Sequence, residues 1–357
     1  GSDGPLHEFR GQHRRTGDYI EFLTTMQRDY YSRRVKEVRE IGFKGVTVTT
    51  AWKSGGPAGS MANLLADSAA DMIDRHNYFG GGAGGHSITE GNVVNRTHLS
   101  DPGRGLLSVG LFQLTDKPFA VSEWSMLPPS PYKAEAAPLY AFYGMGLQGW
   151  DAVYHFACNS DKMGDGWPSL RKYVTETPHY LGQFPALAFA IYHEHIQEGD
   201  VVVQRELGRA DVFAGKDVLG QALSGGGWDA KELTGRLTTS PATLAVGRVT
   251  IGFRKQPQTT SGDISPFHSE RETTLRSTTG QLLWDYGAKR VEIRSNKTQA
   301  VIGFASGTTV RLPAVQAQIE TPFVSLIFTP LDDQALQRSR RILITAMARE
   351  PGASDLA

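Results

Sequence analysis

The sequence predicts an α/β protein in which parallel βα units precede an antiparallel β-sandwich. Between residues 18 and 157, apolar patterns with the helical period alternate with short β-branched or aromatic runs, which is typical of parallel βα units. After about residue 199, short alternating runs separated by turn residues follow one another, which favours a sandwich. We therefore expect a parallel domain over 1–199 and a β-sandwich accessory domain over 200–357.

The elements of the first part follow from local patterns. Apolar side chains at helical spacing predict a helix over 18–41, capped by Asp18 and ended by Gly42. A second helix is expected over 134–147. The β-branched and aromatic runs predict strands over 46–52, 71–79, 119–123 and 152–157. In the second part, strands are expected over 201–203, 248–253, 291–294, 300–304, 323–329 and 341–347.

Composition narrows the classes of partner. The 37 basic side chains balance the 37 acidic ones, so no general attraction to nucleic acid or to an anionic membrane is expected. The single cysteine, Cys158, excludes an internal disulfide framework and a cysteine-based zinc site. The sequence contains no run of about 18 apolar residues, the length that could span a bilayer. The polar start at Gly1–Gly4 lacks the apolar core of a signal peptide. We expect a soluble chain, and its compartment stays unknown.

The expected strand ends carry the side chains that a carbohydrate site needs. In parallel α/β folds, functional residues gather at the carboxyl ends of the strands. Sugars present flat C–H faces and a rim of hydroxyls, which aromatic rings, carboxylates and imidazoles can bind. All the expected ends of the first part carry such groups, at Trp52, His76 to Phe79, Glu123 with Trp124, and Tyr154 to Phe156.

The order of these strand ends resembles strands five to eight of the retaining (β/α)8-barrel glycoside hydrolases, the superfamily that includes the cellulase, mannanase and β-galactosidase families. The likeness covers roughly residues 15–200: a strand ending at Trp52, then His-Asn-Tyr, then Lys117-Pro118 before a strand ending Ser-Glu-Trp. It implies an incomplete TIM-type barrel of about four βα units, which the β-sandwich follows.

The resemblance also implies roles for single residues. Glu123 takes the position of the family's catalytic nucleophile, and His76 and Tyr78 take positions that contact the sugar or orient the nucleophile. The expected aromatic platform for the sugar consists of Trp52, Trp124 and Tyr154. Such chemistry requires neither a metal nor an organic cofactor, so no cofactor is expected.

The chain departs from the family in one respect. A retaining glycosidase needs a second carboxylic acid about 5–5.5 Å from the nucleophile, and the family carries it at the end of strand four. Only about 17 residues precede the helix that starts at Asp18, so strands one to four are expected to be missing. The acid/base would then be Glu8, Asp74 or a residue from another subunit. Because a half barrel exposes strand edges, we also expect self-association that completes the barrel.

The predicted function is a retaining glycoside hydrolase that acts on a β-linked sugar, with two alternatives. The first alternative is a degenerate, non-catalytic carbohydrate-binding module or a truncated fragment. The second is a carboxylesterase with a serine nucleophile, because Ser130 and Lys133 fit a Ser-x-x-Lys pattern just after Glu123. The glycine run 80–85 lacks the following helix that dinucleotide binding requires. The histidines of His193-Glu194-His195 would face apart on a helix, which favours a helix end over a metal site.

Overall fold

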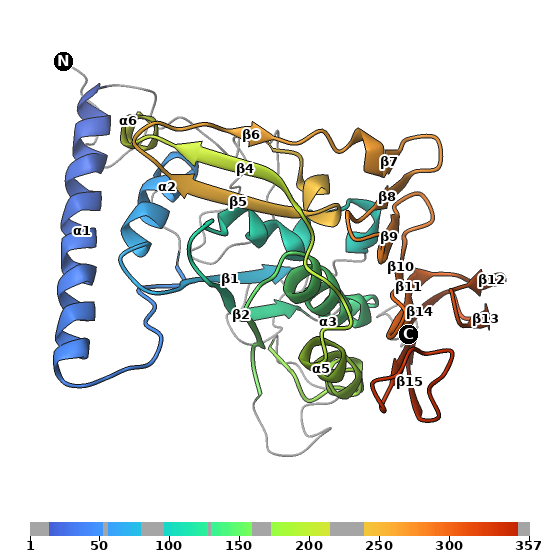
Figure 1. Ribbon diagram of the computed structural model, residues 1–357. Helices are drawn as coiled ribbons and strands as arrows, with labels where there is room; N and C mark the ends of the chain where they lie inside the picture. The colour runs from blue at the N-terminus through green and yellow to red at the C-terminus, as the bar shows by residue number, and fades with distance from the viewer. Residues whose placement is uncertain are drawn as a thin grey trace, which may run out of the picture.

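Figure 1 shows the computed structural model of the chain, which describes residues 14–52, 56–79, 96–127, 130–158, 173–214 and 239–348. The fold is mixed α/β, with parallel strands and helices first and a seven-stranded antiparallel sheet at the end. This order confirms the predicted class at the level of parallel βα units followed by antiparallel structure. Within the described ranges the parallel strands do not close into a barrel.

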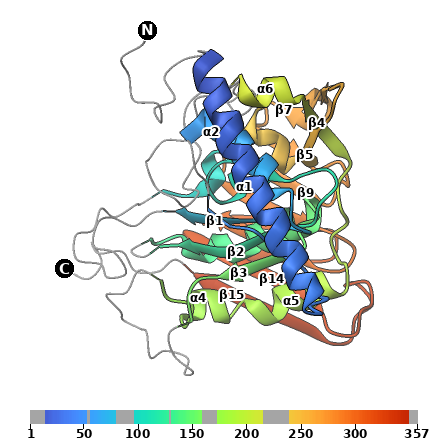
Figure 2. The same cartoon turned by 90° about the vertical axis from the view of Figure 1, so that its left-hand side faces the viewer.

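The first helix, α1 (Arg14–Glu40), lies on the outer side of the molecule and crosses it diagonally in Figure 2. It starts before Asp18, so Asp18 lies inside the helix and does not cap it. Gly42 ends it as expected, because its φ of 96° suits glycine and its N–H bonds to the carbonyl of Arg39 at 3.0 Å. The helix contacts α2 (Gly56–Asp67) and α6 (Arg209–Phe213).

The strand predicted over 46–52 is absent, because that segment has no regular secondary structure. The carboxylate of Asp71 accepts the N–H of Thr47 at 2.8 Å, and the carbonyl of Thr47 accepts the N–H groups of Asp71 and Met72. The segment therefore bonds to the residues just before the next strand through the backbone of Thr47, and it forms no strand ladder there. This side-chain acceptor is the physical reason for the incorrect prediction.

The parallel sheet has the order β1-β2-β3, with β1 spanning Ile73–Phe79, β2 spanning Phe119–Met126 and β3 spanning Ala152–His155. All three predicted strands are confirmed, and β2 runs three residues beyond its predicted end at Glu123. Along the chain, the short helices η1 (His98–Ser100) and η2 (Gly105–Phe112) come between β1 and β2. Because these strands are parallel, their carboxyl ends lie on one side of the sheet. The candidate site residues Tyr78, Glu123 and Tyr154 lie in the second halves of their strands.

The helix predicted over 134–147 is confirmed as helical but irregular. It consists of a 3-10 turn η3 (Lys133–Glu135), a short α3 (Ala136–Pro138) and a π-helix η4 (Leu139–Leu147). Gly144 allows the indole of Trp150 to approach this helix, since a Cβ there would lie 2.5 Å from the ring. Two further helices, α4 (Pro178–Leu181) and α5 (Phe184–Tyr192), follow β3.

The region after residue 200 starts with a small mixed sheet of order β5-β4-β6. Strands β4 (Val201–Leu207) and β5 (Arg248–Phe253) pair in parallel, while β6 (Thr260–Ser261) is antiparallel to β4. The prediction that this region is antiparallel from its start was therefore wrong. Because 40 residues separate β4 from β5, the connection is long enough for a parallel crossover, which the spacing of apolar runs alone did not reveal.

The antiparallel sheet contains seven strands in the order β15-β14-β11-β10-β9-β8-β7. The short 3-10 turns η5 (Pro241–Ala245) and η6 (Ser265–Phe267) precede it. Its strands are β7 (His268–Ser269), β8 (Thr274–Arg276), β9 (Leu282–Asp285), β10 (Arg290–Arg294), β11 (Gln299–Phe304), β14 (Phe323–Pro330) and β15 (Ile342–Ala348), and a separate hairpin pairs β12 (Thr308–Arg311) with β13 (Gln316–Ile319).

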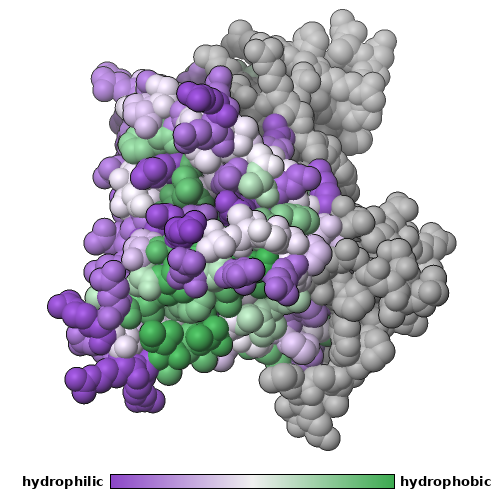
Figure 3. All heavy atoms as spheres, turned by 90° about the vertical axis from the view of Figure 1, so that its right-hand side faces the viewer, coloured by the Kyte–Doolittle hydropathy of each residue, from purple (hydrophilic) through white to green (hydrophobic). Residues whose placement is uncertain are grey.

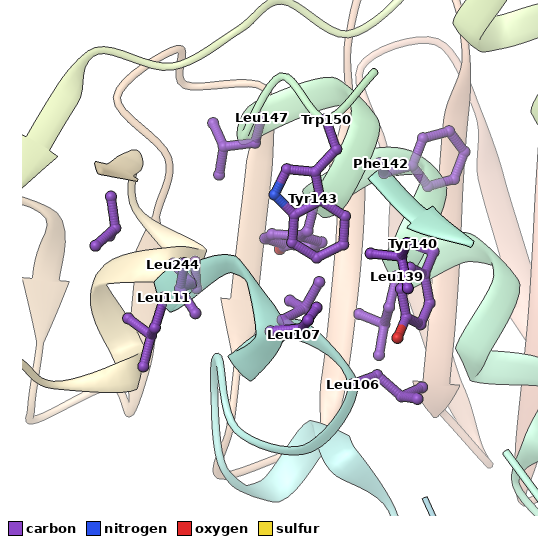
Figure 4. Close-up of a cluster of buried hydrophobic side chains, with 14 of the residues drawn as sticks. Leu106, Leu107, Leu111, Leu139, Tyr140, Phe142, Tyr143, Leu147, Trp150 and Leu244 are labelled. Atoms are coloured by element: carbon purple, nitrogen blue, oxygen red, sulfur yellow. The ribbon is translucent and has the colours of Figure 1, made fainter. Parts of the chain in front are cut away.

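One hydrophobic core joins the two parts of the chain. It combines buried side chains of β1, β2 and η4 with others from β5, β9, β10 and β14. Figure 4 shows part of it, where Leu244 lies near the apolar side chains of η2 and η4. Buried hydrogen bonds cross residue 200 as well, among them Trp284 Nε1 to the carbonyl of Leu99 at 2.9 Å and Ser325 Oγ to Gln183 Oε1 at 2.6 Å. The domain boundary near residue 200 stays a prediction.

The outer side of the antiparallel sheet carries some apolar surface. Figure 3 views the molecule from this side and shows apolar side chains gathered low on the face. Two large exposed apolar side chains of the edge strand β15 are Ile342 and Ile344, which are 42% and 61% exposed. Among the described helices, none is both long enough and apolar enough to cross a membrane.

Candidate functional site

The carboxylate of Glu123 lies near the carboxyl end of β2 and contacts two side chains of β1. The phenol of Tyr78 donates a hydrogen bond to Glu123 Oε2. His76 Nδ1 lies 3.3 Å from the same oxygen and can donate to it when that nitrogen carries the proton. Three residues that the sequence singled out are thus in direct contact.

These three side chains differ in exposure. The side chain of His76 is 7% exposed, whereas that of Glu123 is 31% exposed. The imidazole is therefore held among its neighbours while the carboxylate still reaches solvent. A carboxylate that is held on one side and open on the other suits a nucleophile or a sugar-binding group.

Glu123 owes its direction to a β-bulge in β2. Along β1 and β2, Arg75 pairs with Val121, but the next residue, His76, pairs with Glu123. The register between β2 and β3 skips a residue at the same place, so both neighbouring strands locate the extra residue at Ser122 or Glu123. A bulge of this kind shifts the alternation of side chains along the strand.

Ring contacts confirm that the alternation shifts. Phe119 and Trp124 are five positions apart and would point to opposite faces of a regular strand. Both instead face one aromatic group: Phe119 lies 5.6 Å from Trp150, and Trp124 stacks at 4.4 Å on Tyr140, which contacts Trp150. We call this side of the β1–β2 sheet the core face, and the side that carries Glu123 the site face.

Asp74 has a structural partner at the bulge. Its Oδ1 accepts the backbone N–H of Ser122 at 2.8 Å, and the residue is only 7% exposed. The sequence had offered Asp74 as an acid/base. The structure shows one of its carboxylate oxygens bound to the backbone of β2, next to Glu123.

Aromatic side chains extend the site on both sides of Tyr78. The ring of Trp52 is 47% exposed and lies 5.6 Å from the imidazole of His76. The ring of Tyr173 lies 5.2 Å edge-on from Tyr78, and Phe156 contacts both tyrosines at 6.2 and 5.2 Å. Trp52 is therefore partly exposed beside His76, and its role in a sugar platform stays a prediction.

Trp124 and Tyr154 lie in contrasting environments. Trp124 is 2% exposed and belongs to the core face, where it stacks on Tyr140. Its indole has no free surface for a sugar, because consecutive residues of a strand point to opposite faces and Glu123 occupies the site face. Tyr154 is 61% exposed on β3, the strand next to β2, and keeps a free ring.

A partly buried polar cluster lies on the core side of β3. His155 bonds to Ser125 Oγ at 3.3 Å and to the hydroxyl of Thr175, and its ring packs 4.0 Å from Tyr180. Burial, together with the nearby charge of Lys133, lowers the pKa of His155 to about 3. The same two causes lower the pKa of His179 to about 4. Both imidazoles are therefore neutral at pH 7.

The serine pattern behind the esterase alternative is buried. Ser130 and Lys133 are each 2% exposed, and Ser130 Oγ has no hydrogen-bond partner among the described residues. A serine nucleophile would need a base within hydrogen-bond reach. The acid/base candidate Glu8 and the glycine run 80–85 lie outside the described residues.

The expected orientation of His193 and His195 was wrong. Helix α5 ends at Tyr192, and the φ of 50° at Glu194 turns the chain. As a result both imidazoles approach Asp333, at 3.7 Å from His193 Nδ1 and 3.1 Å from His195 Nε2. Lys297 also bonds to Asp333, at 2.5 Å. In the described part of the chain, no group of histidine, cysteine and acidic residues could hold a metal ion.

Sequence reasoning missed Tyr173 and the link between Asp74 and Ser122. Tyr173 belongs to no strand or helix, so no periodic pattern drew attention to it. The bulge did leave a signal, because the apolar residues of β2 switch from odd positions, Phe119 and Val121, to even positions, Trp124 and Met126.

Comparisons with known proteins add no family to this geometry. Neither the models of protein families nor the curated proteins nor the solved structures that were searched contain a match for this chain. Function is therefore inferred from the side chains around Glu123 and from the strands that carry them.

Proposed function

We propose that the chain is the nucleophile-bearing half of a retaining glycoside hydrolase that acts on a β-linked sugar, with Glu123 as the nucleophile. The single observation that carries this proposal is the contact of one carboxylate oxygen of Glu123 with both the Tyr78 phenol and His76 Nδ1. Donors of this kind hold a carboxylate in one orientation, which attack at an anomeric carbon requires.

Each site residue then has a definite task. Glu123 forms the covalent bond to the sugar, and His76 and Tyr78 orient its carboxylate or bind sugar hydroxyls. The exposed rings of Trp52 and Tyr154 form the platform for the sugar's C–H face. In this proposal β1, β2 and β3 belong to half of a (β/α)8 barrel, and the antiparallel sheet is part of an accessory β-sandwich. No cofactor takes part.

The proton donor comes from outside the described contacts of Glu123. Those contacts are with a phenol and an imidazole, neither of which is the second carboxylic acid of a retaining mechanism. We propose that another copy of the chain supplies it by completing the barrel.

The surface of α1 supports self-association. One stripe of the helix leaves large apolar side chains exposed, and a hollow of about 400 Å³ lies on the same helix, lined by Met26, Asp29, Ser32 and Arg33. The exposed members of the stripe are Phe22, Leu23, Met26 and Tyr30, at 45–58%. Monomers rarely expose such stripes, because apolar surface gains free energy from burial. We expect light scattering after size exclusion to give twice the chain mass, and Met26→Glu to halve it; a monomeric wild type contradicts self-association.

A non-catalytic carbohydrate-binding module is the second candidate. The exposure of Trp52 and Tyr154 favours it, since a platform binds sugar without any proton donor. The two candidates differ in one respect, which is whether Glu123 forms a bond to the sugar.

Activated substrates separate the two candidates. A dinitrophenolate leaves without protonation, so a dinitrophenyl 2-deoxy-2-fluoro-β-glycoside tests the nucleophile even when the acid/base is missing. We expect intact mass to rise by one fluoroglycosyl group, and peptide mapping to locate it on Glu123. Glu123→Gln should take up no label. The control Glu206→Gln, in another sheet, should label like the wild type.

Other outcomes assign the alternatives. If no glycoside of the panel labels or is cleaved while sugar still binds, the chain is a binding module and the catalytic proposal is wrong. Cleavage of short-chain esters that Ser130→Ala abolishes would instead support the esterase.

A further inference from the structure

Asp74 is a buried carboxylate that bonds to the backbone of the neighbouring strand. It accepts the Ser122 N–H at 2.8 Å and lies on β1 two residues before His76 and four before Tyr78. Side chains at these positions of a strand point to one face. We infer that Asp74 is a positioning residue for Glu123, an inference that rests on the proposed function for its catalytic meaning.

The bulge determines which face Glu123 occupies. Phe119 and Val121 belong to the core face, so an unbroken alternation would also direct Glu123 to that face and Trp124 to the site face. The extra residue at Ser122 shifts the alternation by one position. Glu123 then pairs with His76, and Trp124 pairs with Asn77 on the core face.

The bulge needs an acceptor, because its extra residue leaves a backbone N–H without a ladder partner. A buried N–H without an acceptor is strongly disfavoured, and a carboxylate oxygen can serve as that acceptor. Asp74 supplies it to Ser122. One strand thus carries both levels of support: Asp74 holds the backbone of β2, while His76 and Tyr78 hold the carboxylate of Glu123.

Three variants isolate this role. Asp74→Ala removes the acceptor, and Asp74→Asn keeps an oxygen in the same place without the charge. Asp151→Ala is the matched control, because the Asp151 carboxylate accepts the N–H of Phe119, also at 2.8 Å and also in β2, but at the other end of the strand from Glu123. If Asp74→Ala does not fold, Asp74→Ser takes its place, with a hydroxyl in the buried position.

Two readouts follow Glu123 directly. The first is the rate at which the dinitrophenyl fluoroglycoside labels Glu123. We expect Asp74→Ala to lower it by about 10- to 100-fold, as a displacement of about 1 Å would, and Asp74→Asn to restore most of it. The second is the carbon-13 chemical shift of the Glu123 side-chain carboxyl, assigned with Glu123→Gln. It should move in Asp74→Ala and stay in place in Asp74→Asn and Asp151→Ala.

The two readouts keep this inference distinct from the proposed function. A wild type that takes up no label overturns the glycosidase proposal, and the carboxyl shift alone then decides whether Asp74 positions Glu123. A shift and a labelling rate that stay at the wild-type values in Asp74→Ala overturn the positioning role. Equal changes in Asp74→Ala and Asp151→Ala would also overturn it, because they would reflect a general loosening of β2.

Discussion

The hydroxyl of Tyr78 is the residue-scale feature nearest to the proposed chemistry. Tyr78→Phe removes the donor to Glu123 and keeps the ring that packs 5.2 Å from Tyr173. Because a hydrogen bond to a charged group contributes about 1.5–3 kcal/mol, we expect labelling of Glu123 to slow by roughly 10- to 100-fold. The same loss should lower the melting temperature, measured by calorimetry, by only a few degrees, because unfolding of a chain of this size has a large entropy.

A second tyrosine serves as the control for this substitution. Tyr286 bonds to His268 Nε2 at 2.9 Å in the antiparallel sheet, so Tyr286→Phe also removes a phenol that bonds to another side chain. It should leave the labelling rate unchanged. Equal rates for wild type and Tyr78→Phe would mean that the phenol does not hold the carboxylate.

Two partly buried histidines, His155 and His179, make stability depend on pH. Their folded-state pKa values, about 3 for His155 and about 4 for His179, lie below the ordinary value of 6.5, so in between only the unfolded chain binds the protons. The contribution of these two histidines to the free energy of unfolding is therefore fully present above pH 6.5 and decreases as the pH drops towards 4. His155 alone contributes a slope of about 1.4 kcal/mol per pH unit in that window. Urea unfolding at pH 7, 6, 5 and 4.5 measures it.

A pair of variants assigns this slope to the imidazole. His155→Gln cannot take up a proton, so its slope should be smaller than that of the wild type. Thr175→Val removes the hydrogen bond to His155 and keeps the imidazole, so its slope should remain. A His155→Gln variant with the wild-type slope would show that His155 does not carry the effect.

Sequence reasoning found the contacts of Glu123 but not the direction of every neighbour. Glu123, His76 and Tyr78 could be predicted because the ends of parallel strands meet at one edge of a sheet. The platform role of Trp124 could not hold beside that of Glu123, since consecutive strand residues face opposite ways. By that rule, Trp124 lies on the face opposite Glu123, where it is buried.

At the scale of elements, a buried ion pair joins β1 to α2. Arg75 Nη2 bonds to Asp67 Oδ2 at 2.8 Å, with both side chains at most 1% exposed, and Thr49 bonds to the other oxygen of Asp67. Asp67→Asn leaves the guanidinium without its charge partner. We expect it to lower the free energy of unfolding by about 3–5 kcal/mol in urea titrations.

An exposed pair offers the comparison for this variant. Arg39 and Asp71 bond at 2.5 Å, but 35% and 45% of their side chains are exposed. Solvent screens such pairs, so Asp71→Asn should cost no more than about 1 kcal/mol. If Asp67→Asn costs as little, burial of the Arg75 pair is not what holds β1 to α2.

Part of the fold could be predicted from periodicity, and two of the errors share a cause. The helix α1 and the strands β1 to β3, β10, β11, β14 and β15 follow local patterns, whereas α2 and the short strands β6 to β9, β12 and β13 were not predicted. The segment 46–52 and the β4–β5 pair depend on distant partners, namely the Asp71 carboxylate and a strand more than 40 residues away. Local patterns record which face of a segment is apolar, but not which segment pairs with it.

At the scale of the whole molecule, the shared core predicts cooperative unfolding. Side chains from both sides of residue 200 belong to one buried cluster, and Gln148 bonds across it to the carbonyls of Leu244 and Gly247 at 2.9 and 2.6 Å. We expect one transition in calorimetry, with the calorimetric enthalpy equal to the van 't Hoff enthalpy. Two separate transitions would show instead that the parts unfold independently.

The hydrogen bond between Ser325 and Gln183 has a consequence for how the protein can evolve. The β14 strand and the residue before α5 depend on each other's side chains, so recombination at residue 200 would pair a sheet with helices that it does not match. Crossover points ahead of α4 would move both partners together. In related genes we therefore expect positions 183 and 325 to vary together, and we expect the antiparallel sheet to be inherited with α5 rather than exchanged alone.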